Sequence, residues 1–242
     1  MLFFDLDDTI LDTKTINRNV FVKIHQDLQV PMGLEDFMGT FRRILRVAML
    51  RHFDFLPNES IGINPMDYLM TQEPYEPQHM EAFKEDVWTQ LRDLGLTCTR
   101  ETFFQTILNR REDFSSFIPG MEEVLKEVAE LDSLGLITNG ISEIQHGKVQ
   151  ALGLEKSFKK IFVSEDFGYG KPDPRFYQFV LDEVKLEGKD CIMIGDNIQN
   201  DVLGSMAMGF QAIFFKEEKT RYLVPQAKTP QELLEKIKAL YH

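Results

Sequence analysis

The 242-residue chain is 43% hydrophobic, which is ordinary for a globular protein, and its formal net charge is −12. This acidity disfavours nucleic acids and anionic membranes as partners, because like charges repel each other. We find no basic leader segment and no apolar run of about 20 residues, so we expect a cytoplasmic protein without a membrane span. Cys98 and Cys191 lie far apart and predict neither a disulfide framework nor a metal site.

A short apolar run, Leu2–Phe4, leads directly into acidic residues and predicts a buried strand with a polar end. Asp5 and Asp7 follow it two residues apart, so in an extended backbone both side chains point the same way. Two neighbouring carboxylates repel each other unless a cation or a proton compensates them. Taken alone, the pattern also fits a solvated acidic turn.

Residues 14–112 predict a helical subdomain, called the cap below. Apolar side chains recur there at helical spacing. The segment 57–77 contains several prolines and a glycine, and predicts a loop with at most a short helix. The predicted helices cover residues 17–28, 35–51, 80–94 and 99–110.

From residue 117 onward, short apolar strands alternate with helices, which is typical of a parallel sheet covered on both faces. The first strand belongs to this unit, so the prediction is an α/β core of residues 1–13 and 113–242 interrupted by the cap. The predicted strands are 134–137, 161–163, 192–194 and 212–215, and the predicted helices are 121–131, 144–152, 174–184, 200–208 and one after Thr229.

Polar side chains follow the first four predicted core strands at the point where each strand ends. Because ligands bind outside the carboxyl ends of parallel strands, we expect these side chains to meet at one edge of the sheet. Each alone has an ordinary role as a helix cap or a solvated loop residue, but the coincidence at four strand ends favours a site. They are Asp5 and Asp7, then Thr138, Asn139 and Gly140, then Lys171, and finally Asp196 and Asp201.

The acidic members suit metal binding and phosphoryl transfer. Asp5, Asp7 and Asp196 offer hard oxygen ligands of the kind that Mg²⁺ prefers. One carboxylate can attack phosphorus and form an aspartyl-phosphate, while a neighbouring carboxylic acid protonates the leaving group and later activates water.

The remaining members suit phosphate binding. The Thr138 hydroxyl and the amides of Asn139 and Gly140 stand before a helix, where phosphate oxygens bind well. Lys171 adds a point charge for the same anion.

These motifs resemble those of haloacid dehalogenase-superfamily phosphatases with a helical, C1-type cap inserted after the first motif. Residues 5–9 match the D-x-D-x-T motif, Thr138 stands in the second motif, Lys171 in the third, and residues 195–201 match the fourth. The resemblance implies a Rossmann-like parallel sheet with helices on both faces and an all-helical cap. It implies Asp5 as nucleophile, Asp7 as general acid/base, Thr138 and Lys171 as phosphoryl-binding residues, and Mg²⁺ held by the Asp5 carboxylate, the Asp7 carbonyl and Asp196, with Asp201 adjacent or behind.

Within that superfamily, residues 137–145 and 163–166 resemble pyrimidine and non-standard nucleotidases and sialic-acid 9-phosphate phosphatases. The expected function is a Mg²⁺-dependent phosphomonoesterase acting on a small metabolite, with a nucleoside 5′-monophosphate as first candidate. Asp7 argues against a dehalogenase, since halide departure needs no proton. A sugar-phosphate phosphatase, a phosphomutase and a non-catalytic phosphometabolite-binding protein remain alternatives. We expect a monomer or a homodimer.

The cap offers two candidate contacts with substrate. Arg42 and Arg46, with Arg43 between them, could bind a second anionic group of the substrate, and a solvated helix face is the alternative. Phe53 and Phe55 could stack a base, with core packing as the alternative.

Overall fold

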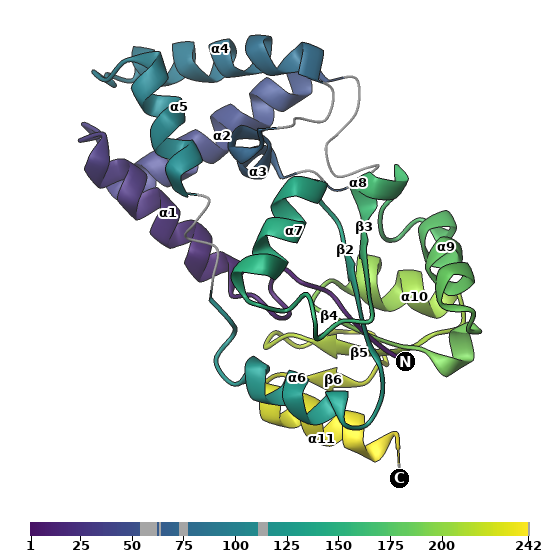
Figure 1. Cartoon of the computed structure of the whole chain (residues 1–242). Helices are drawn as coiled ribbons and strands as arrows, with labels where there is room; N and C mark the ends of the chain where they lie inside the picture. Colours follow the sequence, from purple (N-terminus) through teal and green to yellow (C-terminus); the bar gives the residue numbers. More distant parts are fainter. Residues whose placement is uncertain (54–61, 63, 73–76, 111–115, 242) are drawn as a thin grey trace.

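The computed structural model describes residues 1–53, 62, 64–72, 77–110 and 116–241 (Figure 1). A parallel sheet lies at its centre, in the strand order β3-β2-β1-β4-β5-β6. The apolar run near residue 1 forms the central strand, because β1 pairs with β2 on one side and with β4 on the other. The strands are β1 (Leu2–Phe4), β2 (Leu134–Thr138), β3 (Lys160–Val163), β4 (Ile192–Gly195), β5 (Gln211–Phe215) and β6 (Gln226–Ala227).

Helices cover both faces of the sheet, which confirms the predicted α/β class. Side chains alternate along β1. Leu2 and Phe4 belong to the buried cluster that includes side chains of α6 (Met121–Ala129) and α11 (Pro230–Ala239), while Phe3 belongs to the cluster that includes those of α9 (Pro174–Val184). A Cβ atom on Gly135 would lie 2.5 Å from the Phe3 ring, so the absence of a side chain at this position leaves room for the ring.

The cap helices lie together beside the sheet (Figure 1). The aromatic rings of Phe21, Phe37 and Phe41 pack against one another there, and the apolar side chains of cap and core form one continuous cluster. The short helix α3 falls inside the segment predicted as a loop with at most a short helix. The helices are α1 (Thr13–Asp27), α2 (Leu34–His52), α3 (Pro65–Met70), α4 (Pro77–Asp93) and α5 (Arg100–Leu108). The cap limits of 14 and 112 stay a prediction.

Two chain crossings join cap and core, and they lie side by side. Leu11 pairs with Phe117 as an antiparallel bridge, and hydrogen bonds run from Asp12 N to Ser116 O and from Ile118 N to Ile10 O. The connection is therefore a short two-stranded ribbon.

The remaining elements show where local sequence signals were weakest. The predicted helix 200–208 begins earlier, as a π-helical turn (Ile198–Leu203), because the Asn197 side chain caps it by accepting from two backbone amides; it continues as α10 (Gly204–Ala207). The two-residue strand β6 and the four-residue helix α8 (Ser164–Phe167) are too short to show a period. Helix α7 (Ser142–Ala151) lies close to its prediction.

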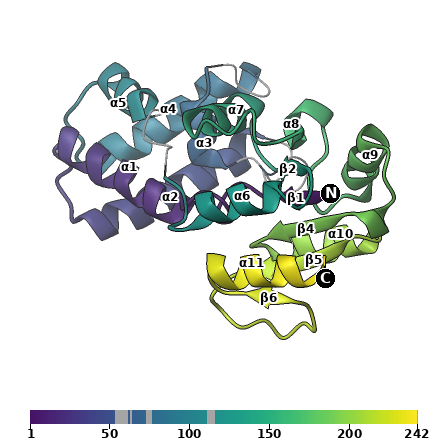
Figure 2. The same cartoon turned by 60° about the horizontal axis from the view of Figure 1, so that its bottom comes forward.

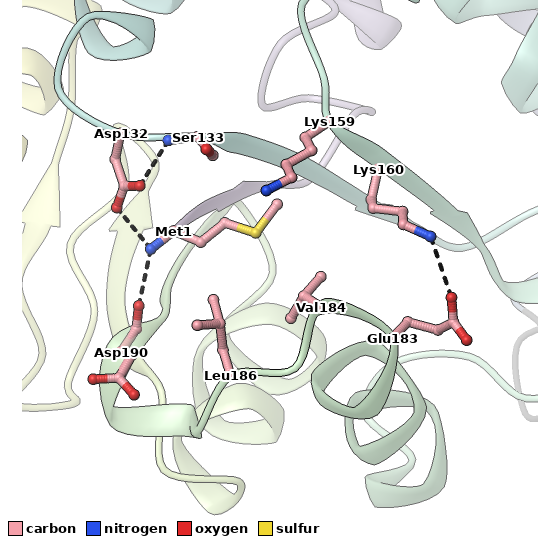
Figure 3. Close-up of a pocket in the computed structure, with 9 residues that line it drawn as sticks. All are labelled: Met1, Asp132, Ser133, Lys159, Lys160, Glu183, Val184, Leu186 and Asp190. Atoms are coloured by element: carbon pink, nitrogen blue, oxygen red, sulfur yellow. Dashed lines mark hydrogen bonds and ion pairs between the residues drawn. The ribbon is translucent and has the colours of Figure 1, made fainter.

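Figure 2 shows the cap helices α1, α2, α4 and α5 grouped together, apart from β5, β6 and α11. The two edges of the sheet differ in chemistry. At the amino ends of the strands, a hollow is lined by Val184, Leu186 and an exposed Lys160–Glu183 ion pair, among others (Figure 3). The polar motif residues lie at the opposite edge. Among the described helices, none is long and apolar enough to cross a membrane.

Candidate active site

A polar cavity of about 520 Å³ opens at the carboxyl ends of β1, β2 and β4. The core contributes the predicted acidic residues, Thr138, Asn139 and Lys171, and the cap contributes Asn17, Asn64 and Asp67. The described lining contains six carboxylates and two lysines, and neither lysine comes from the cap. The predicted convergence of strand ends therefore occurs, although Gly140 is not among the described lining residues.

Asp5 lies buried against a buried lysine. Lys171 Nζ donates to Asp5 Oδ1 over 2.7 Å and to Asp201 Oδ1 over 2.6 Å, and Thr9 donates to the other oxygen of Asp5. Burial raises the pKa of Asp5 well above its usual range; Lys171 opposes this, while Asp201 and Asp196 add to it. The pKa of Lys171 is raised as well, because its two carboxylate partners outweigh its burial.

Asp7 sits in a different environment, with hydrogen bonds to both of its oxygens. Thr13 Oγ1 donates to Oδ1 over 2.8 Å, and Gln145 Nε2 donates to Oδ2 over 2.9 Å. Lys148 Nζ contacts both oxygens, at 2.9 and 3.1 Å. Burial alone would raise the pKa of Asp7, but Lys148, Gln145 and Thr13 together hold it below the usual value. The two carboxylates after β1 thus have pKa values shifted in opposite directions.

The loop that carries Lys171 is held in place by Asn139. The Asn139 amide nitrogen donates to Lys171 O, and Lys171 N donates to Asn139 Oδ1, both over 2.8 Å. A Cβ atom on Gly170 would lie 2.7 Å from Asn139 Oδ1, so glycine is required for this close approach. Lys171 Nζ also donates to Ile137 O, which fixes the side chain over the end of β2.

The second motif differs in part from its prediction. The Thr138 hydroxyl oxygen, almost fully buried, accepts from Gln145 Nε2 over 2.6 Å at the cavity wall. Gly140, in contrast, is not among the described lining residues, and its amide donates to Ser164 Oγ over 2.9 Å. In this arrangement the Gly140 amide donates its hydrogen bond to the Ser164 hydroxyl, so its binding of phosphate stays a prediction.

The acidic residues fit a divalent cation. Oxygen atoms of Asp5, Asp196 and Asp201 all lie within 4.8 Å of one another, which is the hard-oxygen donor set that Mg²⁺ prefers. Lys216 Nζ donates to Asp196 over 2.8 Å, yet burial still raises the pKa of Asp196. Asp201 uses one oxygen for Lys171 and accepts from Asn197 N with the other, so the protein already engages both of its oxygens.

The cap residues chosen from sequence do not reach the cavity. Arg42 and Arg46 are exposed on α2, and the Arg42 guanidinium lies 5.0 Å from the centre of the Phe21 ring. The expectation that they bind substrate finds no support here, because the buried face of α2 packs within the cap and these arginines lie outside it. Phe53 is buried within the cap, where its ring contacts that of Tyr68. Phe55 lies outside the described residues.

Two buried charges at the site were missed by sequence reasoning. Lys148 follows Gln145 by three residues on α7, so helical spacing could have placed it on the same face. Asp67 lies on the short helix α3, inside a segment whose prolines hid any period.

Comparison with known proteins identifies the family. The model of haloacid dehalogenase-like hydrolases matches residues 1–209. The phosphoserine phosphatase of Thermus thermophilus is 29% identical over 224 residues, covering 88% of this chain and 87% of the relative. Pyrimidine 5′-nucleotidase YjjG of Escherichia coli is 22% identical over 162 residues, covering 60% and 72%.

A solved structure shares the fold along the whole chain. It is that of the HAD-hydrolase YfnB of Bacillus subtilis, with a TM-score of 0.70 at 20% identity, covering 98% of this chain and 97% of the other. With residues 1–209 matched by the family model, this chain belongs to the haloacid dehalogenase-like hydrolases.

Proposed function

We propose that this protein is a Mg²⁺-dependent phosphomonoesterase that forms an aspartyl-phosphate on Asp5. One observation carries the proposal: Asp5, Asp7, Thr138 and Lys171 come from three separate strand ends and all line one cavity. A carboxylate that attacks phosphorus, a second carboxyl group that moves a proton, and a lysine and a hydroxyl that bind phosphoryl oxygens are the groups that this reaction needs.

The first step transfers the phosphoryl group to the enzyme. An Asp5 carboxylate oxygen attacks phosphorus, the bond from phosphorus to the leaving oxygen breaks, and the Asp7 carboxylic acid gives that oxygen its proton. Lys171 and the Thr138 hydroxyl hold the phosphoryl oxygens. When bound by Asp5, Asp196 and the Asp7 carbonyl, Mg²⁺ would neutralise charge on the phosphate.

The second step returns the enzyme to its starting state. Asp7, now a carboxylate, takes a proton from water as the water oxygen attacks phosphorus. The bond between phosphorus and Asp5 breaks, and inorganic phosphate leaves. The hydrogen bonds to Asp7 favour this ionised form, while a phosphate dianion beside it raises its pKa again and favours the acid needed in the first step.

The cavity supports a substrate with one phosphate and an uncharged or zwitterionic leaving group. Apart from Gly62, the described cap residues at the cavity are two asparagines and Asp67, whose side chains can hydrogen-bond to hydroxyl or amino groups. The carboxylate of Asp67 repels a second anion. A nucleoside 5′-monophosphate stays the first candidate, in line with the nucleotidase relative. A phosphorylated amino acid is the second, favoured because the described lining contains no aromatic side chain to stack a base.

A phosphatase screen tests the proposal. The panel holds nucleoside 5′-monophosphates, phosphoserine, triose and hexose phosphates and p-nitrophenyl phosphate, each with Mg²⁺ and with phosphate release as readout. We expect Asp5→Asn to abolish release, whereas the exposed control Asp182→Asn retains it. Release by Asp5→Asn at the wild-type rate, or no release from any ester by the wild type, would contradict the proposal.

A further inference from the structure

Lys148 is a buried cation that the proposed reaction does not use. Its side chain is 5% exposed, and its Nζ contacts both carboxylate oxygens of Asp7 at 2.9 and 3.1 Å. On its other side, Nζ lies 3.5 Å from Oδ2 of Asp67 on α3. The lysine therefore stands between the acid/base residue of the core and a buried carboxylate of the cap.

We propose that Lys148 is a positioning residue for Asp7, and that Asp67 links this positioning to the placement of the cap. The inference rests on the proposed function, because it assigns Asp7 the role of acid and base. It goes beyond that function by giving two residues outside the four motifs a task in the reaction.

The contacts of Asp7 show why a positioning residue is needed. A general acid works only within hydrogen-bond reach of the leaving oxygen, so a small rotation of its carboxyl group removes its effect. Among the described residues, Lys148 donates to both Asp7 oxygens, and it thereby limits rotation about the bond to the carboxyl group. Gln145, one turn earlier on α7, holds the Oδ2 side and also Thr138.

The same helix also holds the cap. Near the first turn of α7, Glu143 Oε2 accepts from Thr71 Oγ1 over 2.5 Å and from Gln72 N over 2.8 Å, at the end of α3. The α3 segment thus meets α7 at two places, Glu143 and Lys148. Moving α3 away from α7 would withdraw Asp67 from Lys148. This would change the electrostatic attraction that holds the lysine between the carboxylates of Asp7 and Asp67.

A buried ion pair with a purely structural role would show the same contacts, so the test needs a readout that separates the two roles. Leaving-group dependence provides it. An alkyl phosphate needs a proton on its poor leaving oxygen, whereas p-nitrophenolate leaves readily without one. Misplacing the acid therefore slows hydrolysis of the alkyl ester far more than that of p-nitrophenyl phosphate.

The main experiment measures kcat/KM of Lys148→Met on both esters. We expect a loss of about 100-fold on the alkyl ester and of less than about 10-fold on p-nitrophenyl phosphate. Lys126→Met is the matched control, because Lys126 is exposed and pairs with Glu122 on its own helix; it should retain both activities. Equal losses of Lys148→Met on the two esters, or no loss on either, would overturn the proposal.

Asp67→Asn tests the cap side of the inference, and it serves alone if Lys148→Met fails to fold. It should lower kcat/KM on the alkyl ester by several-fold while sparing p-nitrophenyl phosphate, and it should add little to Lys148→Met in the double variant, because the two residues act on Asp7 as one unit. An unchanged ratio between the two esters contradicts the role of Asp67. A wild-type protein that hydrolyses neither ester refutes the proposed function instead.

Discussion

Lys171 donates to Asp5 over 2.7 Å, although the two residues lie 166 positions apart in the chain. The pair is almost fully buried, and Asp201 completes it from a third segment. The charges that balance one another at the site therefore come from three distant parts of the sequence. We expect Lys171 to stabilise the fold as well as to be a candidate for phosphate binding.

Replacing Lys171 with methionine should impair folding and activity together. Removing one partner of a buried ion pair leaves the other charge uncompensated and costs roughly 3–5 kcal/mol. We expect urea unfolding at pH 7 to show a loss of about 3 kcal/mol, and the loss should shrink at lower pH because protonation of Asp5 removes the uncompensated charge. We expect kcat to fall by about 100-fold or more. Wild-type stability and turnover in Lys171→Met would show that the pair has neither role.

Magnesium should stabilise the wild type through Asp196. A ligand that binds only the folded state at 100 times its Kd adds about 2.7 kcal/mol of stability. We expect Mg²⁺ to raise the thermal midpoint of the wild type, and EDTA to remove both the shift and the activity. Asp196→Asn should lose most of the shift, because one of three neighbouring oxygen ligands becomes an amide. An equal Mg²⁺ response in Asp196→Asn would place the ion elsewhere, and Asp182→Asn should respond like the wild type.

Arg42→Ala and Arg46→Ala should leave KM unchanged within about twofold on the best substrate. Both side chains are exposed on α2 and neither is among the described residues of the cavity wall, so substrate does not meet them. Arg42→Ala should cost about 0.5 kcal/mol of stability from the lost contact with the Phe21 ring. A rise in KM in either variant would show that these arginines contact the substrate.

Asp86 should contribute pH-dependent stability to the cap. It lies on α4, and its carboxylate accepts from Arg51 at the end of α2 with 3.1 Å to each oxygen, and from Gln90 over 2.8 Å. Burial would raise the pKa of Asp86, but Arg51, Gln90 and His52 hold it below the usual value. A lowered folded pKa stabilises above the unfolded pKa, and this stabilisation fades as pH falls through the folded value.

The measurement for Asp86 compares urea unfolding of Asp86→Asn with the wild type. Because Arg51 is largely exposed, we expect a loss of only about 1 kcal/mol at pH 7, shrinking below about pH 4. Glu122→Gln, which removes an exposed pair with Lys126, should cost less. A gap that stays constant down to pH 3 would mean that the charge of Asp86 is not the cause.

The sheet edge that carries the candidate site could be predicted from sequence because the grouping of its residues follows from the topology. Parallel strands bring their carboxyl ends together, so Asp5, Thr138, Lys171 and Asp196 could be grouped without knowing any distance. What stayed hidden depends on side-chain direction. Whether the Gly140 amide faces phosphate or Ser164 is decided by a hydroxyl 24 residues later, which no local pattern reveals.

The cap was harder to predict for a related reason. Helical period located its helices but not the face that meets the core, so Arg42 and Arg46 were favoured for their charge. Asp67 was overlooked because α3 has only six residues.

The central position of β1 has a consequence for how the chain folds. Leu2 pairs with Leu134 on one side and with Ile192 on the other, so the strand that Asp5 and Asp7 follow is synthesised long before either neighbour. The cap helices can form from local contacts in the meantime, whereas the middle of the sheet must wait for distant segments, and such long-range pairing is slow. Until β4 is synthesised, one edge of β1 has unpaired backbone groups, and the side chains of this strand are all apolar. Such an edge promotes misassembly. The sheet can therefore close around β1 only after β4 (Ile192–Gly195) has been synthesised.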